Sequence, residues 1–255
     1  MTRINDNGET LRLNRYLAQC GLGSRRKADE LISTGHVYVN GKRVTEMGVK
    51  VLPGRDIIEY HGKQVKPIRN LVYYAYNKPV NVIVTKNDPQ KRETVYDALK
   101  KKKIDVEHLN YVGRLDYNSE GLLLLTNDGD LIHSVTHPRF KIKKVYRVKI
   151  MRRLSSEEID MLIGGIESDG QILHAASVRD VSQPASDRKQ FWYEIELFEG
   201  KNRQIRRMMK ELSVGISRLR RIQFGSVKLN NLVSGDIRTL TEKEVAALKN
   251  CGYKR

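Results

Sequence analysis

The sequence predicts an α+β protein in which a small unit of two helices and a hairpin precedes a larger unit of mixed strands and helices. Three observations predict it: apolar residues recur at helical spacing near the N-terminus, an Asn-Gly pair then separates two alternating strands, and strand-like apolar runs begin at Leu71. The 255 residues suffice for a small domain beside a medium-sized one. We therefore expect a polar tail at 1–9, a first domain at 10–66, a linker at 67–70 and a second domain at 71–255.

The chain is strongly basic. It carries 47 Lys and Arg against 30 Asp and Glu, a formal net charge of +17, which favours a polyanionic partner and nucleic acid first. Its two cysteines, Cys20 and Cys251, lie far apart and fit no metal or redox motif, which is typical of a reduced compartment. The start lacks the apolar core of a signal peptide, and no run is long enough to span a bilayer. We expect a cytoplasmic protein without a membrane partner.

A first short helix is predicted near the N-terminus. Leu13, Tyr16 and Leu17 recur at i, i+3 and i+4, so one face of this helix can be buried. Arg12 and Arg15 then remain exposed and available for phosphate groups.

A second helix is predicted between Ser24, which is suited to cap its N-terminus, and Gly35, which is suited to end it in the left-handed conformation. Its apolar positions are Ala28, Leu31 and Ile32. Its first turn carries three basic residues, namely Arg25, Arg26 and Lys27. Because positive charge at a helix N-terminus opposes the helix dipole, we interpret this turn as a phosphate-binding feature in preference to a solvated face.

A hairpin is predicted over residues 37–44. Alternating apolar residues flank Asn40-Gly41, a pair suited to a two-residue type I′ turn, and Lys42 and Arg43 follow. The stretch from Leu13 to Val44 resembles the RNA-binding domain named after ribosomal protein S4. That resemblance implies that the two helices and the start of the hairpin bind structured RNA.

The larger unit begins with a different pattern. We expect strands at 71–76 and 80–85, a helix at 94–101 and a solvated helix end at 100–103. A continuously apolar run at 122–126 predicts a buried strand.

Asp116 precedes that buried strand in an irregular connection, where a rigid scaffold can present a side chain for chemistry. On the residues alone, an aspartate in a loop is more often a cap or a turn former. The surrounding segment favours the functional interpretation.

Several segments together resemble the signature of the pseudouridine synthase branch that acts on bacterial ribosomal RNA: residues 113–116, 119–123, 125–129, 144–148 and 199–208. The resemblance implies a catalytic domain with a large mixed, mainly antiparallel sheet flanked by helices. It also implies an isomerase that needs no cofactor, because the uracil N1–ribose C1′ bond is broken and remade through C5 without a redox change or a group donor.

The resemblance further implies roles for particular residues. Asp116 is the nucleophile or base, Arg206 is the arginine that meets it, and Tyr146 stacks on the target base. Arg114 would contact a phosphate or occupy the space left by the extruded nucleotide.

The segment around Arg206 also predicts a two-faced helix. Ile205, Met208, Met209 and Leu212 fall on one face, and Arg203, Arg206, Arg207 and Lys210 fall opposite. Arg206 would therefore have to bend toward Asp116, and Arg203 could lie nearer. We expect the remaining cations of this face to bind RNA together with Arg220, from the basic tract Arg218, Arg220 and Arg221.

Other patterns say less about function. His133 and His137 are spaced i, i+4 without a metalloprotease glutamate, and Asn127-Asp128-Gly129 is better explained as a turn than as half of a cation site. We assign no metal. Two alternatives stay open: a non-catalytic RNA-binding or ribosome-assembly factor, and a metal-dependent nuclease or phosphoryl-transfer enzyme using Asp116, Asp128 and Asp130.

The expected partner is structured ribosomal RNA, with the large-subunit RNA favoured, either free or within a subunit or assembly intermediate. The target uridine should be one that can be flipped out of a hairpin or junction. We expect the protein itself to be a monomer.

Overall fold

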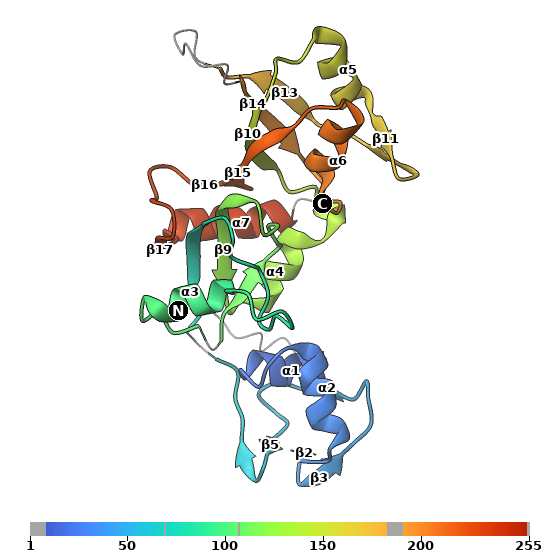
Figure 1. Cartoon of the computed structure of the whole chain (residues 1–255). Helices are drawn as coiled ribbons and strands as arrows, with labels where there is room; N and C mark the ends of the chain where they lie inside the picture. Colours follow the sequence, from blue (N-terminus) through green and yellow to red (C-terminus); the bar gives the residue numbers. More distant parts are fainter. Residues whose placement is uncertain (1–8, 69, 107, 183–190, 254–255) are drawn as a thin grey trace. The chain divides into compact units, whose positions relative to one another are not determined.

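The computed structural model describes residues 9–68, 70–106, 108–182 and 191–253 and divides into two compact units, 1–71 and 72–255 (Figure 1). Most of the predicted polar tail and Arg69 of the predicted linker lie outside the described residues.

The first unit contains the predicted helices and hairpin. Helix α1 spans Leu13–Gln19 and α2 spans Arg25–Ser33, with the Ser24 side chain accepting a hydrogen bond from the Lys27 amide. The strands are β1 (Leu11–Arg12), which pairs with β4 (Lys50–Val51), and a sheet in the order β3 (Lys42–Val44), β2 (Val37–Val39), β5 (Ile58–Tyr60) and β6 (Lys63–Gln64). Asn40 and Gly41 both have positive φ, as the type I′ turn requires.

The second unit is built on one large sheet. Its main path is β13 (Ser177–Asp180), β14 (Phe191–Leu197), β10 (Lys144–Ile150), β15 (Ile216–Phe224), β9 (Glu120–Thr126), β7 (Tyr73–Lys78) and β17 (Ile237–Thr239), with β16 (Val227–Lys228) paired to β15 and β8 (Asn110–Val112) to β9. Among the described strands of this sheet, β9 and β15 run parallel and the other pairs are antiparallel. The predicted mixed, mainly antiparallel sheet is confirmed.

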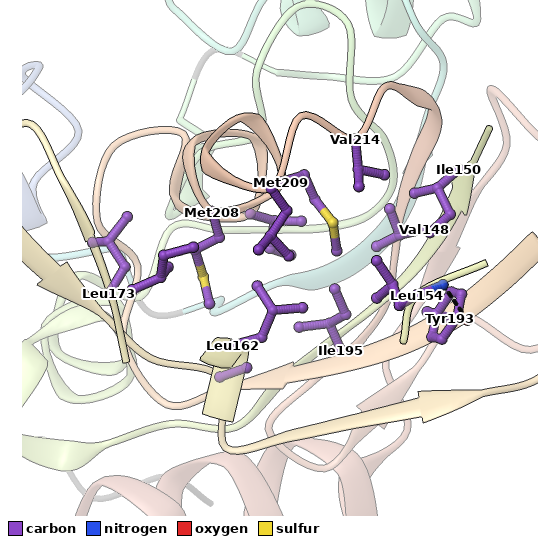
Figure 2. Close-up of a cluster of buried hydrophobic side chains, with 14 of the residues drawn as sticks. Val148, Ile150, Leu154, Leu162, Leu173, Tyr193, Ile195, Met208, Met209 and Val214 are labelled. Atoms are coloured by element: carbon purple, nitrogen blue, oxygen red, sulfur yellow. Dashed lines mark hydrogen bonds between the residues drawn. The ribbon is translucent and has the colours of Figure 1, made fainter. Parts of the chain in front are cut away.

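Helices flank this sheet. They are α3 (Val95–Lys101), α4 (Gly129–Thr136), the 3-10 turn η1 (Pro138–Phe140), α5 (Ser156–Gly164), α6 (Gln204–Glu211) and α7 (Glu242–Tyr253). A separate hairpin pairs β11 (Ile166–Ser168) with β12 (Gln171–Leu173). From α6, Met208 and Met209 point into a buried cluster with Val148, Leu162 and Ile195 (Figure 2).

The parallel pair β9 and β15 joins the two halves of the sheet. Every residue of β9 is buried, which confirms the predicted buried strand and extends it back to Glu120. Gly121 has φ +102, and a Cβ atom there would overlap the carbonyl oxygen of Arg221. Glycine is therefore required where the two strands approach, close to the loop that carries Asp116.

Two local predictions were wrong. Residues 80–85 form no strand, because Pro79 lacks an N–H, Asn81 has φ +61, and pairing is limited to a single bridge between Ile83 and Thr94. Asp128 does not end a turn after β9. Its side chain accepts hydrogen bonds from the amides of Asp130 and Leu131, so it caps the N-terminus of α4.

Candidate active site

Asp116 lies in the loop between β8 and β9. The Ser119 amide donates to the Asp116 carbonyl at 3.0 Å, and the Asn81 amide donates to the Tyr117 carbonyl at 2.9 Å, so the loop is held from within and from the neighbouring segment. The Asp116 side chain keeps 34% of its surface exposed. A carboxylate on a fixed loop is thus accessible to a substrate.

Two arginines meet this carboxylate, Arg206 on α6 and Arg203 at its N-cap. Nε of Arg206 lies 3.8 Å from Oδ2 of Asp116, and Nη1 of Arg203 lies 4.0 Å from the same oxygen. The Arg206 side chain is 17% exposed and that of Arg203 is 52% exposed. Both candidate arginines therefore reach Asp116, but only Arg206 does so from a largely buried position.

Arg206 also holds the loop itself. Its Nη2 donates to the Asn118 carbonyl at 2.8 Å and to Oγ of Ser119 at 3.2 Å. Burial lowers the pKa of Arg206, and the negative charge of Asp116 opposes that shift. Because an arginine side chain stays protonated in proteins, a desolvated positive charge faces the carboxylate.

A cationic groove adjoins these arginines. Arg203, Arg206 and Lys210 line it together with residues 213–216, and its volume is about 340 Å³. Its cations are suited to a chain of phosphate groups passing close to Asp116.

Tyr146 lies on β10 and is half-buried. It is opposite Arg221 on one neighbouring strand and Ile195 on the other, and it packs against the cluster that contains Leu115, the residue before Asp116. The fold thereby brings the segment of Tyr146 to the same region as the loop.

Lys78 lies near Asp116, although nothing in the sequence pattern singled it out. Lys78 is fully buried at the end of β7, where its Nζ donates to the carbonyls of Pro79 at 2.8 Å and Val82 at 2.7 Å. Burial lowers the pKa of Lys78 to about 8, and the charges of Asp116 and Glu120 oppose the shift. The available signal was a lysine closing a strand immediately before a proline.

Two arginines of the basic tract at 218–221 make their contacts within the protein. Arg218 forms a two-point pair with the buried Glu120. Arg221 is 2% exposed, and its Nε donates to the Leu122 carbonyl at 2.8 Å. Arg221 therefore cannot form part of an exposed wall for RNA, whereas Arg220 is half-buried.

The other predicted RNA-binding cations take varied positions. In the first unit they are exposed on β1, the two helices and the hairpin, namely Arg12, Arg15, Arg25, Arg26, Lys27, Lys42 and Arg43. Arg114 is exposed on the loop of Asp116. Arg207, in contrast, points to the β11–β12 hairpin and pairs with Asp169 at 3.0 Å.

The candidate metal ligands do not come together. Within the described ranges, no three histidine, cysteine, aspartate or glutamate side chains gather in a way that could hold a metal ion. Oδ2 of Asp128 accepts a hydrogen bond from the Tyr73 hydroxyl at 2.8 Å, so that carboxylate serves the fold. In the same described part of the chain, no helix has the length and apolar character needed to cross a membrane.

Comparison with known proteins shows which family the chain belongs to. Residues 72–211 match the family described as RNA pseudouridylate synthase, and residues 11–57 match the S4 domain. The chain belongs to the RNA pseudouridylate synthase family. The recognition, fold class and enzyme class predicted from the sequence are confirmed, and the enzyme is an isomerase that converts uridine in RNA to pseudouridine.

Individual relatives match over almost the whole chain. An uncharacterized RNA pseudouridine synthase of Aquifex aeolicus is 38% identical, covering 96% of both chains. The ribosomal large subunit pseudouridine synthase B of Bacillus subtilis is 37% identical, covering 93% of this chain and 95% of its own length. A crystal structure of a pseudouridylate synthase superposes with a TM-score of 0.66 at 26% identity, covering 93% of this chain and 99% of the other. These matches favour neither a nuclease nor a non-catalytic RNA-binding factor.

Proposed function

We propose that this enzyme isomerises a specific uridine of ribosomal RNA, in the large subunit, with Asp116 as nucleophile or base. The observation that carries the proposal is the accessible Asp116 carboxylate, held by Arg203 and Arg206 on a loop that Arg206 also fixes. The name of the Bacillus subtilis relative supports the choice of the large-subunit RNA.

The reaction is balanced without a donor or an oxidant. The N1–C1′ bond breaks, the uracil turns within the pocket, C5 bonds to C1′, and the proton at C5 is lost while N1 regains one. The carboxylate acts at the sugar or the base, and the two guanidinium groups orient it. Tyr146 stacks on the flipped base, which must leave its helix before its C1′ and C5 atoms are accessible.

RNA affinity comes from cations in both units. In the first unit these are the exposed residues Arg12, Arg15, Arg25, Arg26, Lys27, Lys42 and Arg43. In the second unit they are Arg114, Arg203, Lys210 and Arg220, of which Arg203 and Lys210 line the groove. The substrate is a structured ribosomal RNA, free or within a subunit or assembly intermediate, in the cytoplasm, and the enzyme acts as a monomer.

The test is carbodiimide mapping of pseudouridines in ribosomal RNA from cells that lack this protein. The cells are complemented with the wild type, with Asp116→Asn, or with Asp160→Asn, a matched control at an exposed position on α5. We expect one site to be lost and to be restored by the wild type and the control but not by Asp116→Asn. Restoration by Asp116→Asn would remove Asp116 from the reaction, and no change in either subunit's RNA would refute the substrate.

A further inference from the structure

Helix α6 presents three stripes of residues with different neighbours. The first stripe is buried and consists of Ile205, Met208, Met209 and Leu212. The second contains Arg206 and Lys210, which line the groove beside Asp116 together with Arg203 at the N-cap. The third contains Gln204, Arg207 and Glu211, and all three side chains contact the β11–β12 hairpin or the residue that follows it.

Arg207 makes the densest set of contacts in the third stripe. Its side chain is 16% exposed, with Nε 3.0 Å from Oδ2 of Asp169 and Nη1 donating to Oε1 of Gln171 at 3.2 Å. Nη2 donates to the Ser168 carbonyl. The guanidinium is therefore engaged by the tip of the hairpin and is not directed at the groove.

Gln204 and Glu211 extend this attachment along the helix. Nε2 of Gln204 donates to the His174 carbonyl at 3.0 Å, just after β12. Oε1 of Glu211 accepts a hydrogen bond from Oγ of Ser168 at 2.7 Å. Polar contacts thus fix α6 to the hairpin from its first turn to its last. The ribbon of α6 lies beside β11 (Figure 1).

The buried stripe does not by itself set the rotation of α6. Its central residues, Met208 and Met209, are unbranched and adaptable, so they hold the helix on the sheet without setting its rotation sharply (Figure 2). Hydrogen bonds to a planar guanidinium are directional and do set it. Because successive helix residues differ by about 100°, fixing Arg207 on the hairpin fixes the direction of Arg206 toward Asp116.

We infer that Arg207 is a positioning residue of the reaction and not an RNA contact. By fixing α6 to the β11–β12 hairpin, it sets the rotation of the helix at which Arg206 and Arg203 meet Asp116. This inference rests on the proposed role of Asp116.

Steady-state pseudouridine formation by the full-length enzyme, on a ribosomal RNA fragment containing the mapped uridine, tests the inference. We expect Arg207→Gln to lower kcat about 10- to 100-fold, with KM and the salt dependence of RNA binding nearly unchanged, since a misplacement of about 1 Å costs that much. The kcat of Arg207→Lys should lie between those of the wild type and Arg207→Gln, because an ammonium group can replace only part of the contacts. Lys210→Gln, which removes a groove cation one turn from Arg206, should instead raise KM and flatten the salt dependence.

Two results would overturn the inference. A raised KM with a flatter salt dependence and normal kcat in Arg207→Gln would make Arg207 an RNA contact. A kcat that falls only in proportion to the unfolded fraction, measured by thermal unfolding, would make its role purely structural.

Hydrogen exchange separates this inference from the proposed function, because it needs no turnover. In Arg207→Gln we expect faster amide exchange in peptides covering 166–173 and 204–211 and unchanged exchange in β7 and β9. Unchanged exchange in both peptides would refute the attachment of α6. If the wild type forms no pseudouridine in ribosomal RNA, the proposed function fails, and with it the catalytic role of Arg207, whereas the exchange result still decides whether the attachment exists.

Discussion

Nε of Arg206 lies 3.8 Å from Oδ2 of Asp116, and the same guanidinium donates to the carbonyl of Asn118. One side chain therefore both faces the carboxylate and holds the loop that carries it. Arg203, at 4.0 Å, shares the first contact, but within the described part of the chain it makes no hydrogen bond to the loop. The two arginines should consequently contribute unequally.

Lysine substitutions should separate them. Arg206→Lys keeps the charge but loses the geometry that spans Asp116 and Asn118, so we expect about a 100-fold lower single-turnover rate. Arg203→Lys, at an exposed position, should lower that rate only a few-fold and leave RNA binding nearly unchanged, because the groove keeps its charge. Equal losses in the two variants would contradict this assignment.

Lys78 should impose an upper pH limit on activity. Its pKa is lowered to about 8, so the positive charge near Asp116 is lost as the pH rises through that value. We expect kcat/KM of the wild type to fall above pH 8, and Lys78→Met to have lower activity at pH 7 without that decline.

The pH dependence of stability separates this loss of activity from unfolding. Because the folded-state pKa of Lys78 is below the ordinary value of 10.5, the unfolded chain binds more protons between about pH 8 and 10.5, and this group's contribution to stability rises with pH there. Lys144→Met is the matched control, since burial also lowers the pKa of Lys144 to about 8 but its charged neighbours are Arg221 and Glu199. If the decline persisted in Lys78→Met and disappeared in Lys144→Met, the titrating group would be Lys144 and not Lys78.

The first turn of α2 should contribute to the salt dependence of RNA binding. Replacing Arg25, Arg26 and Lys27 with glutamine should reduce the slope of log K against log salt by about 2 to 3, with kcat at saturating RNA retained. Replacing Lys100, Lys101 and Lys103 removes the same charge from exposed positions at the end of α3 and serves as control. Equal slopes for the two triple variants would indicate a non-specific effect of net charge.

Gly121 should be intolerant of a side chain. A Cβ atom would overlap the backbone of Arg221 and force φ +102 on an alanine, so we expect Gly121→Ala to lower the free energy of unfolding by about 1–3 kcal/mol. Gly129→Ala is the control, because a Cβ there meets no atom within 4 Å and the residue is helical. Urea denaturation measures both, and a Gly121→Ala variant as stable as the control would show that the strands can separate without cost.

Local sequence was sufficient for several features that follow short-range rules. The periodicity of Leu13, Tyr16 and Leu17, the cap at Ser24 and the Asn40-Gly41 turn each depend on neighbours in the chain, and the structure confirms all three. The apolar run of β9 similarly located the buried strand that follows Asp116. The resemblance of whole segments to a known family then supplied the enzyme class, which no single short pattern could.

Contacts between distant segments were decided by the tertiary structure alone. The helical pattern of α6 placed Arg203, Arg206 and Arg207 together as one charged face, yet packing directs the first two to Asp116 and the third to Asp169. Burial of Lys78 and Arg221 was equally hidden, because a charged residue enters a core only where acceptors from other segments, such as the carbonyls of Val82 and Leu122, replace its water. Periodicity reports which side of an element is apolar, but the partner of each polar side chain depends on which elements the fold brings beside it.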